Sequence, residues 1–364
     1  MKVDPKKTTP VVFVGLSGGV DSSVTAALLQ KAGYAVVGVF IKVWQPDFIE
    51  CTWREERRDA MRVAAHLGIP FLTFDLEKEY KQGVADYMIR EYERGRTPNP
   101  DVMCNKEVKF GAFLEKALAM GADFVATGHY ARGGIDPKSG KHMLKTGSDT
   151  EKDQSYFLWT LKQEQLSRIL FPVGALKKPE VRKYAGAFEL PTETKKDSQG
   201  VCFLGKLDMK EFLKHYIVAQ KGPVLDMSGK IIGSHEGAVF YTIGERHGFV
   251  ISEKHSDDAP LYIVAKDIKN NTITVASRQT VMQKKDSISE IDIESINWIA
   301  QAPKVGDRVF ARFRYRQELL PCIITSLKER SVVVSCTATQ EVISPGQSIV
   351  FYDGDICLGG GIIS

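Results

Sequence analysis

Two of the six cysteines stand in polar surroundings, where a thiol is free to react. Cys104 begins CNKEVKF (104–110), and Cys202 lies within DSQGVCFLG (197–205). A structural cysteine usually sits in an apolar run, where burial raises the thiol pKa and makes the sulfur inert. If the two sulfurs approach each other, one can carry a persulfide and the other can cleave it by thiol–disulfide exchange. Spacing alone leaves open that they are two unrelated buried cysteines.

The surroundings of Cys104 are expected to favour a thiolate. A predicted helix starts near Asn105, which places the sulfur at the positive end of the helix dipole, and Lys106 is close in sequence. Both effects lower a thiol pKa. Cys202 follows a turn, DSQG, which favours exposure. There is no C-x-x-C pair or zinc-like spacing, and a static disulfide framework is not expected. The other four cysteines are predicted to be structural: Cys51, Cys322, Cys336 and Cys357.

The string GLSGGVDSS (15–23) joins a predicted strand to a helix and is typical of an anion-binding loop. Gly18 and Gly19 leave room for a ligand against the backbone, the serines supply hydroxyls, and the helix N-terminus presents N–H groups. Asp21 would repel a bare phosphate, but it fits if Mg²⁺ lies between its carboxylate and the phosphates. No G-K-[ST] follows, so this is not a Walker loop. The structural alternative is a Ser/Asp-capped helix after a glycine turn.

The first half of the sequence alternates apolar strand-like runs with amphipathic helical patterns. Strands are expected in VVFVGLS (11–17), YAVVGVFIKVW (34–44), IPFLTFDL (69–76) and ADFVATGHY (122–130). This alternation predicts an α/β fold with a doubly wound parallel sheet, covered by helices on both faces. Its active site should lie at the carboxyl ends of the strands. A helix is expected over 107–121, after the loop RTPNPDVMCN (96–105).

The pattern changes after about residue 205. GPVLDMSGKIIGSHEG (222–237) predicts a hairpin around Ser228–Gly229, and short β runs follow to about 273. Almost only strands follow from about 274, with a turn at Asp353–Gly354, which indicates a small β-barrel or sandwich. The predicted domains are an α/β domain (1–205), a small β-rich central domain (206–273) and a C-terminal β-barrel (274–364).

The composition is that of an ordinary soluble globular protein. Among 364 residues, 43% are hydrophobic and 26% are charged. The longest apolar runs are far too short to span a membrane, and the polar start MKVDPKKTTP is not a secretory signal. We therefore expect a cytoplasmic protein, and a monomer. The formal net charge of +4 is compatible with a nucleic-acid partner but also describes a solvated surface.

The S-G-G-x-D-S-S loop resembles that of the PP-loop ATP pyrophosphatase superfamily, with its adenine nucleotide alpha-hydrolase-like fold. Further segments match in order, and from about residue 11 to the C-terminus the chain resembles the tRNA-specific 2-thiouridylase family. Those segments are GRTPNPDVMCNKEVKFG (95–111), ATGHYAR (126–132), KDQSYFLWTL (152–161), LFPVG (170–174), KKDSQGVCFLG (195–205), PGQS (345–348) and CLGGGII (357–363).

This resemblance implies ATP-dependent 2-thiolation of the wobble uridine in the tRNAs for Lys, Glu and Gln. ATP would adenylate the uridine C2 oxygen with release of pyrophosphate, and sulfur would then displace AMP. Cys202 would take a persulfide sulfur from a donor protein, a cysteine desulfurase or sulfur-relay protein, and Cys104 would be the nucleophile. Asp101 is the candidate general acid/base, the alternative being a plain Asx-turn residue. The target base must leave the anticodon stack to be reached.

The resemblance also implies binding residues. Those for ATP, with its Mg²⁺, are Gly15, Leu16, Ser17, Gly18, Gly19, Val20, Asp21, Ser22, Ile41 and Gly128. Those for the target base and tRNA are Asn99, Pro100, Asp101, His129, Lys152, Asp153, Gln154, Arg314, Tyr315 and Gln347. The family more often has methionine at the position of Ile41. A histidine at a strand end is more often structural, and residues 152–154 could form a helix-capping turn.

ARFRYRQ (311–317) is predicted to be a strand with Arg312, Arg314 and Arg316 on one face and the aromatic residues on the other. That alternation also fits solvent on one side and core on the other. Two other functions remain as alternatives. An amide-forming PP-loop synthetase would need no cysteine pair, and a non-catalytic tRNA-binding or sulfur-carrying protein would need no intact S-G-G-x-D-S-S loop.

Overall fold

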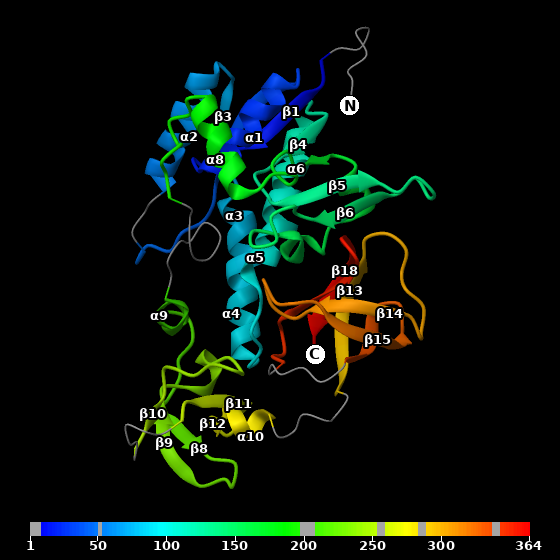
Figure 1. Cartoon of the computed structure of the whole chain (residues 1–364). Helices are drawn as coiled ribbons and strands as arrows, with labels where there is room; N and C mark the ends of the chain where they lie inside the picture. Colours follow the sequence, from blue (N-terminus) through cyan, green and yellow to red (C-terminus); the bar gives the residue numbers. More distant parts are fainter. Residues whose placement is uncertain (1–8, 50–52, 197–207, 253–258, 283–288, 337–342) are drawn as a thin grey trace.

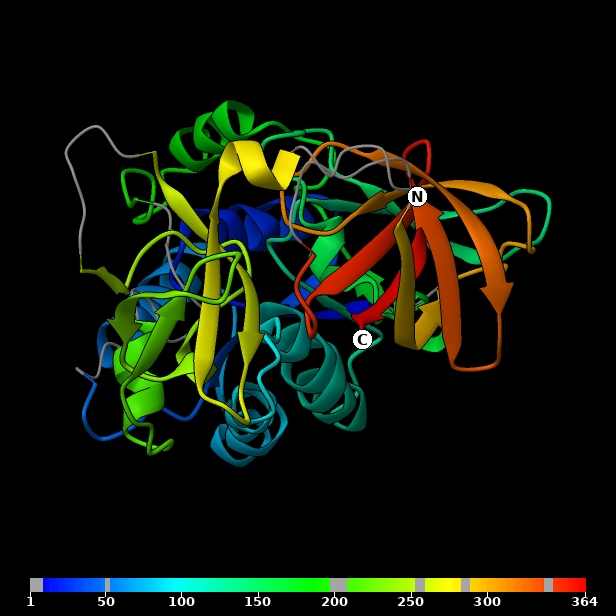
Figure 2. The ribbon, with the colours of Figure 1, turned by 90° about the horizontal axis from the view of Figure 1, so that it is seen from below.

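The computed structural model describes residues 9–49, 53–196, 208–252, 259–282, 289–336 and 343–364. These residues form a parallel α/β domain, a small central sheet and a β-barrel (Figure 1). The central sheet and the barrel lie next to each other below the α/β domain (Figures 1 and 2). Within the described ranges, no helix is long and apolar enough to cross a membrane.

A five-stranded parallel sheet forms the centre of the first domain. Its order is β3-β2-β1-β4-β7, and every pairing is parallel, which confirms the predicted parallel α/β fold. The strand order reverses beside β1, so the chain crosses to opposite sides of the sheet there and leaves a crevice at the carboxyl ends. The strands are β1 (Val11–Gly15), β2 (Ala35–Lys42), β3 (Phe71–Asp75), β4 (Phe124–Ala126) and β7 (Ile169–Leu170).

Several helices pack on this sheet, among them α1 (Val20–Lys31), α2 (Trp53–Leu67) and α8 (Lys178–Ala187). Another long helix consists of α3 (Glu77–Tyr80), the π-helical η1 (Lys81–Ala85) and α4 (Asp86–Glu93). Its neighbour consists of α5 (Pro100–Met103), the π-helical η2 (Cys104–Ala112) and α6 (Phe113–Ala119). Helical stretches of the π type are rare and occur often at functional sites.

The second of these long helices begins earlier than the sequence pattern predicted. Asn99 is its N-cap, with Oδ1 accepting a hydrogen bond from Val102 N at 3.2 Å, and Pro100 occupies the first turn. Pro is well suited to this position because it lacks the N–H that would otherwise have no partner there. The prediction of a loop through residue 105 was therefore wrong, and Cys104 lies in the second helical turn.

The central domain is a five-stranded sheet of order β10-β9-β8-β12-β11. The predicted hairpin around Ser228–Gly229 is confirmed, because β8 pairs antiparallel with β9 and Gly229 has a φ of +86°. Met88 and Tyr92 of α4 belong to the apolar core of this domain, which fixes the sheet to the α/β domain. Its elements are α9 (Met209–Lys214), β8 (Gly222–Leu225), β9 (Ile231–His235), β10 (Val250–Ile251), β11 (Leu261–Asp267), β12 (Thr272–Ser277) and α10 (Arg278–Met282).

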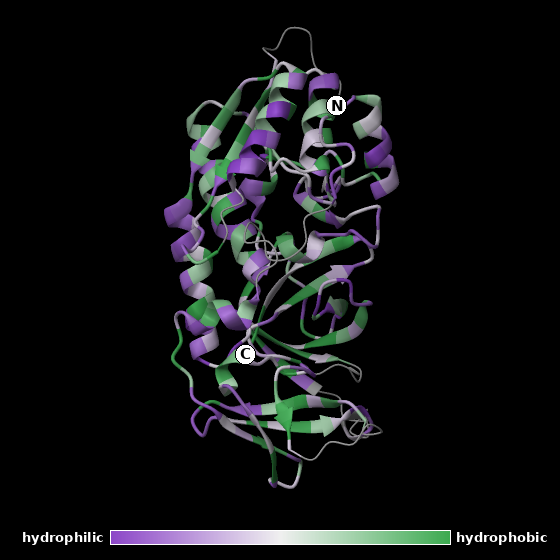
Figure 3. Ribbon diagram, turned by 90° about the vertical axis from the view of Figure 1, so that its left-hand side faces the viewer, coloured by the Kyte–Doolittle hydropathy of each residue, from purple (hydrophilic) through white to green (hydrophobic). Residues whose placement is uncertain are grey.

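The C-terminal strands close into the predicted barrel. The order β13-β16-β15-β14-β17-β18 is completed by pairing of β13 with β18. Hydrophobic residues run along these strands (Figure 3), and their inward side chains form one core. The strands are β13 (Ser289–Trp298), β14 (Arg308–Arg312), β15 (Leu320–Leu327), β16 (Ser331–Cys336), β17 (Ser348–Asp353) and β18 (Ile356–Ile363).

A hairpin from the first domain extends this barrel sheet. β5 (Ala131–Ile135) and β6 (His142–Thr146) pair with each other, and β6 also pairs antiparallel with β18. The α/β domain and the barrel therefore share a hydrogen-bonded sheet. This connection fixes the barrel relative to the crevice at the carboxyl ends of the parallel strands.

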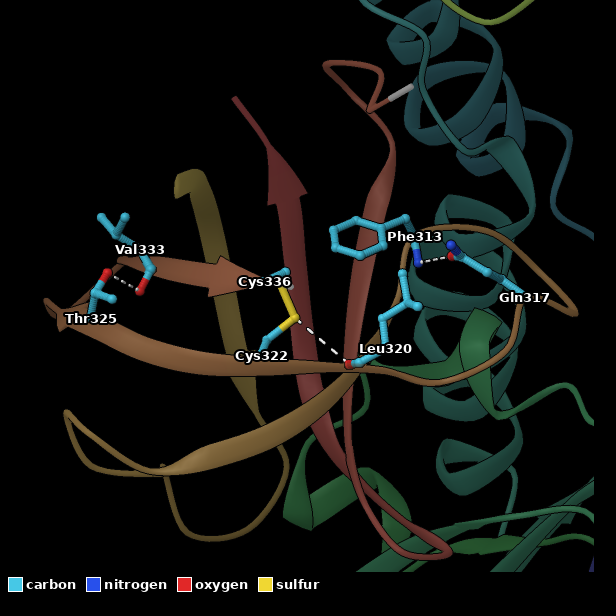
Figure 4. The surroundings of a disulfide bond; sticks show 7 residues. All are labelled: Phe313, Gln317, Leu320, Cys322, Thr325, Val333 and Cys336. Carbon is cyan, nitrogen blue, oxygen red and sulfur yellow. Dashed lines mark hydrogen bonds between the residues drawn. A yellow bond between two sulfur atoms is a disulfide. The ribbon is translucent and has the colours of Figure 1, made fainter. Parts of the chain in front are cut away.

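Cys322 and Cys336 form a disulfide between neighbouring strands of the barrel (Figure 4). They are directly opposite in the pairing of β15 with β16, and their Cα atoms are 4.1 Å apart. A static disulfide framework was not expected, and the sequence did not predict this pair, because strand register brings together two residues that the sequence separates. Of the other described cysteines, Cys104 and Cys357 are both buried. Cys51 and Cys202 lie outside the described residues.

The strand predicted over residues 311–317 ends at Arg312. Beyond it the chain turns, and Arg316 has a φ of +64°. The Gln317 side chain replaces a strand partner here, because its Oε1 accepts hydrogen bonds from Phe313 N at 2.7 Å and Arg314 N at 3.2 Å. The predicted basic face with Arg312, Arg314 and Arg316 is therefore wrong.

Candidate active site

The glycine–serine loop (residues 15–23) runs from the carboxyl end of β1 into α1. Gly18 has a φ of +73°, and a Cβ at this position would lie 2.6 Å from the carbonyl oxygen of Glu56. Only glycine meets both conditions. Gly19 is the N-cap of α1, a helix of 12 residues. Because glycine has no side chain, the N-cap offers no side-chain acceptor to the first N–H groups of this helix. An uncapped helix N-terminus attracts anions.

The serines of the glycine–serine loop hold its shape. Ser22 Oγ donates to Gly19 O at 3.1 Å and lies 3.2 Å from Ser17 Oγ, and Ser23 Oγ donates to Gly19 O at 2.8 Å. Leu16 and Val20 are buried in the core. Of the predicted ATP-binding residues, these two therefore have only backbone groups to offer a ligand, whereas Ser17 and Ser22 have hydroxyls.

Asp21 is paired with a lysine from a distant helix. Lys178 Nζ lies 2.7 Å from Oδ1 and 2.9 Å from Oδ2 of Asp21, and Tyr130 donates its hydroxyl to Oδ1 at 2.8 Å. No group of three or more His, Cys, Asp and Glu side chains suited to a metal was found in the described part of the chain. The loop offers one carboxylate, which already has cationic and hydroxyl partners. These residues do not by themselves form a Mg²⁺ site.

The carboxyl ends of β1, β2 and β4 meet beside this loop. A Cβ on Gly128 would lie 2.8 Å from Asp21 C and from Ser22 N, so the chain after β4 passes directly against the start of α1. Ile41, at the end of β2, is buried, and its Cδ1 lies 3.9 Å from a Cβ placed on Gly15. The predicted ATP-binding residues from three strands thus surround one point on the sheet edge.

Cys104 is fully buried rather than exposed in a polar loop. Its exposed fraction is 0%, and it belongs to the apolar core that packs the long helices on the parallel sheet. Lys106 forms an ion pair with Glu107 at 2.9 Å, so its charge is shared with a carboxylate. Asp101 lies in the first turn of α5, where the helix dipole stabilises a negative charge. The expected polar setting of Cys104 is wrong for this state of the protein.

His129 links the glycine–serine loop to the helix that carries Cys104. It follows Gly128, and its ring lies 5.6 Å from that of Phe110 in η2. Its exposed fraction is 7%, and Nδ1 lies 2.7 Å from Thr127 Oγ1. Burial, assisted by the charge of Lys109, holds the pKa of His129 well below the usual 6.5. The side chain is therefore neutral and enclosed, so in this state little of it is available to RNA.

Asp153, the middle residue of the run 152–154, connects the first domain to the barrel. Asp153 is 3% exposed, and Oδ1 accepts hydrogen bonds from Gly147 N and Ser155 N, while Oδ2 pairs with Arg312 of the barrel at 2.6 Å. Gln154 Oε1 accepts from Tyr130 N at 3.0 Å. Lys152 is half-buried at the turn before them. Asp153 therefore accepts backbone hydrogen bonds as a capping residue does, which fits the alternative of a helix-capping turn.

Arg314 and Tyr315 lie on the barrel loop that faces the Cys104 helix. Arg314 is exposed, and the Tyr315 ring lies 4.7 Å from the ring of Phe157. The carbonyl of Phe157 accepts a hydrogen bond from Asn105 Nδ2 at 3.2 Å. The loop is thus connected through one residue to the neighbour of Cys104, and the exposed Arg314 lies on it.

Gln347 uses its side chain to hold the segment before α5. Nε2 donates to Thr97 O at 2.9 Å and lies 3.4 Å from Pro98 O. This segment continues into Asn99, Pro100 and Asp101. A predicted tRNA contact from the barrel thus lies against the predicted target-base residues of the first domain.

Cys202 lies outside the described residues, but Lys195, near the end of the described range before it, lies close to the glycine–serine loop. Lys195 Nζ pairs with Asp59 Oδ2 at 2.6 Å, and Asp59 Cβ would lie 3.1 Å from a Cβ on Gly18. Burial alone would raise the pKa of Asp59, but hydrogen bonds and charges from Lys195 and Arg62 outweigh it and lower the pKa. Cys202 is seven positions after Lys195 in the sequence (202 − 195).

Sequence reasoning missed Lys178, Tyr130 and Arg312 as partners of site residues. Lys178 stands before Pro179 in KKPEVRKYAG (177–186), a pattern that predicts a helix start, but nothing local shows that its partner is Asp21. Arg312 was noted only for its alternation with aromatic residues. These pairs link positions more than a hundred residues apart, so only the fold reveals them.

Three family descriptions match consecutive parts of the chain. Residues 10–206 match a tRNA methyl transferase HUP domain, 210–277 a tRNA methyl transferase PRC-barrel domain, and 288–363 an aminomethyltransferase beta-barrel domain. Among solved structures, a 4-thiouridine synthetase–RNA complex with bound ATP matches at 20% identity, with a TM-score of 0.34, over 57% of this chain and 50% of that chain. That similarity is too low to support a functional conclusion.

Curated relatives are similar over nearly the full length. The tRNA-specific 2-thiouridylase MnmA of Geobacillus thermodenitrificans is 45% identical over 97% of this chain and 94% of its own. The proteins of the same name from Streptococcus sanguinis and Exiguobacterium sibiricum are each 46% identical, over 97% and 99% of this chain and 94% of their own. The sheet-edge loop, the helix with Cys104 and the closed barrel are therefore parts of a known type of enzyme. This chain belongs to the tRNA-specific 2-thiouridylase family.

Proposed function

We propose that this chain is an ATP-dependent tRNA-uridine 2-sulfurtransferase that thiolates the wobble uridine of the tRNAs for Lys, Glu and Gln. One observation carries the proposal. An anion-binding loop at the edge of the parallel sheet connects through Gly128, His129 and Phe110 to the helix with Asp101 and Cys104. Activation of a carbonyl oxygen by ATP and attack by sulfur would thus take place in one crevice.

The glycine–serine loop would bind ATP at the N-terminus of α1. The uncapped N–H groups and the hydroxyls of Ser17 and Ser22 would receive the phosphates, and Ile41 would pack against adenine. The uridine C2 oxygen would attack the α-phosphorus, with pyrophosphate leaving. Mg²⁺ would enter with the nucleotide, and its approach to Asp21 would require exchange with Lys178. The adenylated uridine then carries AMP as a good leaving group.

Sulfur transfer would use the two cysteines. A donor protein of the cysteine desulfurase or sulfur-relay class would leave a persulfide, Cys202–S–SH. The Cys104 thiolate would attack the Cys202 Sγ, forming a Cys104–Cys202 disulfide and releasing hydrosulfide. Hydrosulfide would add to C2 and expel AMP, giving 2-thiouridine, and an external thiol would supply the two electrons that reduce the disulfide. Asp101, in the first turn of α5, would handle the proton.

The tRNA would lie across the face shared by the first domain and the barrel. Arg314 is exposed next to the Cys104 helix, and Asn99 and Pro100 begin that helix. Contacts from Arg314 to phosphate would position the RNA without reading its sequence. A reaction on tRNA would take place in the cytoplasm.

Replacement of Cys202 by Ser is the deciding test, with Cys357→Ala as the control at a buried cysteine in the barrel. The expected result is loss of 2-thiouridine, measured by mass spectrometry of tRNA nucleosides, with tRNA binding retained. Persistence of 2-thiouridine in the Cys202→Ser protein would rule out the persulfide route. If the unaltered protein, supplied with ATP and a persulfide donor, leaves the tRNA unmodified, the alternatives of a binding protein or an amide-forming synthetase would be favoured.

A further inference from the structure

The segment Gly95–Pro98, between α4 and α5, is held by the barrel. Thr97 N donates to Pro345 O at 2.8 Å, and Gln347 Nε2 donates to Thr97 O at 2.9 Å. Both backbone polar groups of Thr97 are thus bound by residues about 250 positions away in sequence. Two residues after Thr97, Asn99 caps the helix that carries Asp101 and Cys104.

Gly346 allows the barrel loop to approach this closely. Its φ is +91°, and a Cβ there would lie 2.8 Å from Thr97 N and 3.0 Å from Arg96 Cβ. Because the nearest atom belongs to the backbone, a side-chain rotation would not relieve the contact. The fit between the two loops therefore depends on the absence of a side chain at position 346.

Ion pairs and a contact from the central domain also hold the segment Gly95–Pro98. Arg96 forms ion pairs with Glu91 at 2.8 Å and with Glu294 of the barrel at 2.5 Å. Thr97 Oγ1 donates to Thr242 Oγ1 of the central domain at 3.2 Å. All three domains thus meet at the four residues that lead into the helix with Asp101 and Cys104.

The barrel loop is also connected to the loop that carries Arg314. The Tyr156 hydroxyl is buried between Ser348 O at 2.8 Å and Phe313 O at 3.2 Å, next to Gln347 and Arg314 respectively. The loop with Arg314 and the barrel loop that holds the segment before α5 are therefore joined through one buried hydroxyl.

We propose that the barrel loop Ser344–Gln347 is a clamp that positions Gly95–Pro98, and through it Asn99, Asp101 and Cys104, for thiolation. Gln347 is then a positioning residue, in addition to any contact it makes with tRNA. This inference rests on the proposed function for its activity readout. The clamp itself can be tested without measuring activity, by hydrogen exchange in the segment that it holds.

Gly346→Ala tests the clamp, and Gly306→Ala is its matched control. Gly306 lies in the same barrel with a φ of +92°, and a Cβ there would meet nothing within 4 Å. Both variants carry the same backbone strain, but only Gly346→Ala presses on Thr97. We expect single-turnover thiolation at saturating tRNA to fall by about 10- to 100-fold in Gly346→Ala alone, since small misplacements of reacting groups have effects of this size. The dissociation constants for tRNA and ATP should stay within about twofold of the unaltered protein.

Gln347→Glu gives an independent measurement. The variant keeps the shape of the side chain but turns a carboxylate oxygen toward Thr97 O, so it should slow single-turnover thiolation. Gln347→Lys restores an N–H donor and should therefore recover part of the rate. Equal effects of Gly346→Ala and Gly306→Ala would overturn the proposal. So would a Gln347→Glu protein that binds tRNA weakly but turns over at the normal rate, the behaviour of a direct tRNA contact.

Hydrogen exchange separates failure of the clamp from failure of the proposed function. Amides in peptides covering residues 95–104 should exchange faster in Gly346→Ala than in Gly306→Ala. That difference is expected whether or not the protein thiolates tRNA. Its absence would overturn the clamp even if 2-thiouridine forms normally.

Discussion

Lys178 holds Asp21 by both carboxylate oxygens, at 2.7 Å and 2.9 Å, and so brings a cation from α8 to the start of α1. The pair is mostly shielded from solvent, with side chains 13% and 30% exposed. In an anion-binding loop an unpaired Asp21 would oppose the ligand. Lys178 cancels that charge at the N-terminus of α1.

Replacement of Lys178 by Met should therefore weaken ATP binding. The loss of the cation leaves Asp21 unneutralised, and we expect about a tenfold higher dissociation constant, equivalent to about 1.4 kcal/mol. Equilibrium dialysis with labelled ATP measures this. Lys183→Met, at an exposed position of the same helix, is the control. Equal affinities for the two variants would show that Lys178 only stabilises the fold. In the Lys178→Met background, Asp21→Asn should restore part of the affinity for ATP, because it removes the unneutralised charge.

The Cys322–Cys336 disulfide should stabilise the barrel without contributing to activity. It closes a loop of 14 residues, for which the chain-entropy model gives about 3 kcal/mol. Urea unfolding with and without a reductant should show this difference, and the Cys322→Ala/Cys336→Ala double variant should unfold identically in both conditions. A reductant-sensitive double variant, or unchanged stability of the reduced protein, would contradict the assignment.

The sequence was sufficient for features that depend on local pattern. Continuous apolar runs predicted the parallel strands, and Ser228–Gly229 and Asp353–Gly354 predicted two hairpins that the structure contains. The start of the helix at Pro100 could also have been predicted, because Asn at the N-cap followed by Pro is a typical helix start.

Other features of the site depend on pairs that are distant in sequence. Asp153 meets Arg312 over 159 positions, and Gln347 meets Thr97 over 250. Periodicity carries no information about such contacts. Burial of Cys104 was missed for the same reason: its polar neighbour Asn105 is itself buried and bonds to Phe157 O, and the core around Cys104 is built from several elements.

His129 should make stability depend on pH. Its pKa in the folded protein is well below 6.5 because the ring is buried. Above pH 6.5 the ring is neutral in both states and contributes no pH dependence. As pH falls below 6.5 the unfolded chain takes up a proton that the folded protein does not, so the free energy of unfolding decreases by up to about 1.4 kcal/mol per pH unit. The decrease ends once the folded pKa is passed.

Replacement of His129 by Gln should flatten this dependence. Urea denaturation of both proteins between pH 8 and pH 5 gives the two slopes, and the difference should appear only below about pH 6.5. His66→Gln is a useful control, because that histidine lies on α2 and bonds only through Nε2 to Phe188 O among the contacts described. Parallel curves for the unaltered and His129→Gln proteins would mean that the pKa of His129 is the same in the folded and unfolded states.

Cys104 should become reactive only when tRNA binds. Its sulfur is enclosed in the resting state, yet the proposed chemistry needs it to reach the Cys202 Sγ. Alkylation by iodoacetamide, followed by peptide mass spectrometry, should therefore be slow without RNA. Adding tRNA and a non-hydrolysable ATP analogue should accelerate it by about tenfold or more, which corresponds to a shift of about 1.4 kcal/mol in the opening equilibrium.

Cys357 is an internal control for this experiment, because it is equally enclosed and burial raises its pKa to about 12. Its alkylation should stay slow under all native conditions, so a rise at Cys104 alone reports local opening of the α5–η2 helix. A parallel rise at both thiols would indicate global unfolding instead. Fast labelling of Cys104 in the RNA-free protein would show that the buried arrangement does not persist in solution, and with it the need for tRNA to open the site would disappear.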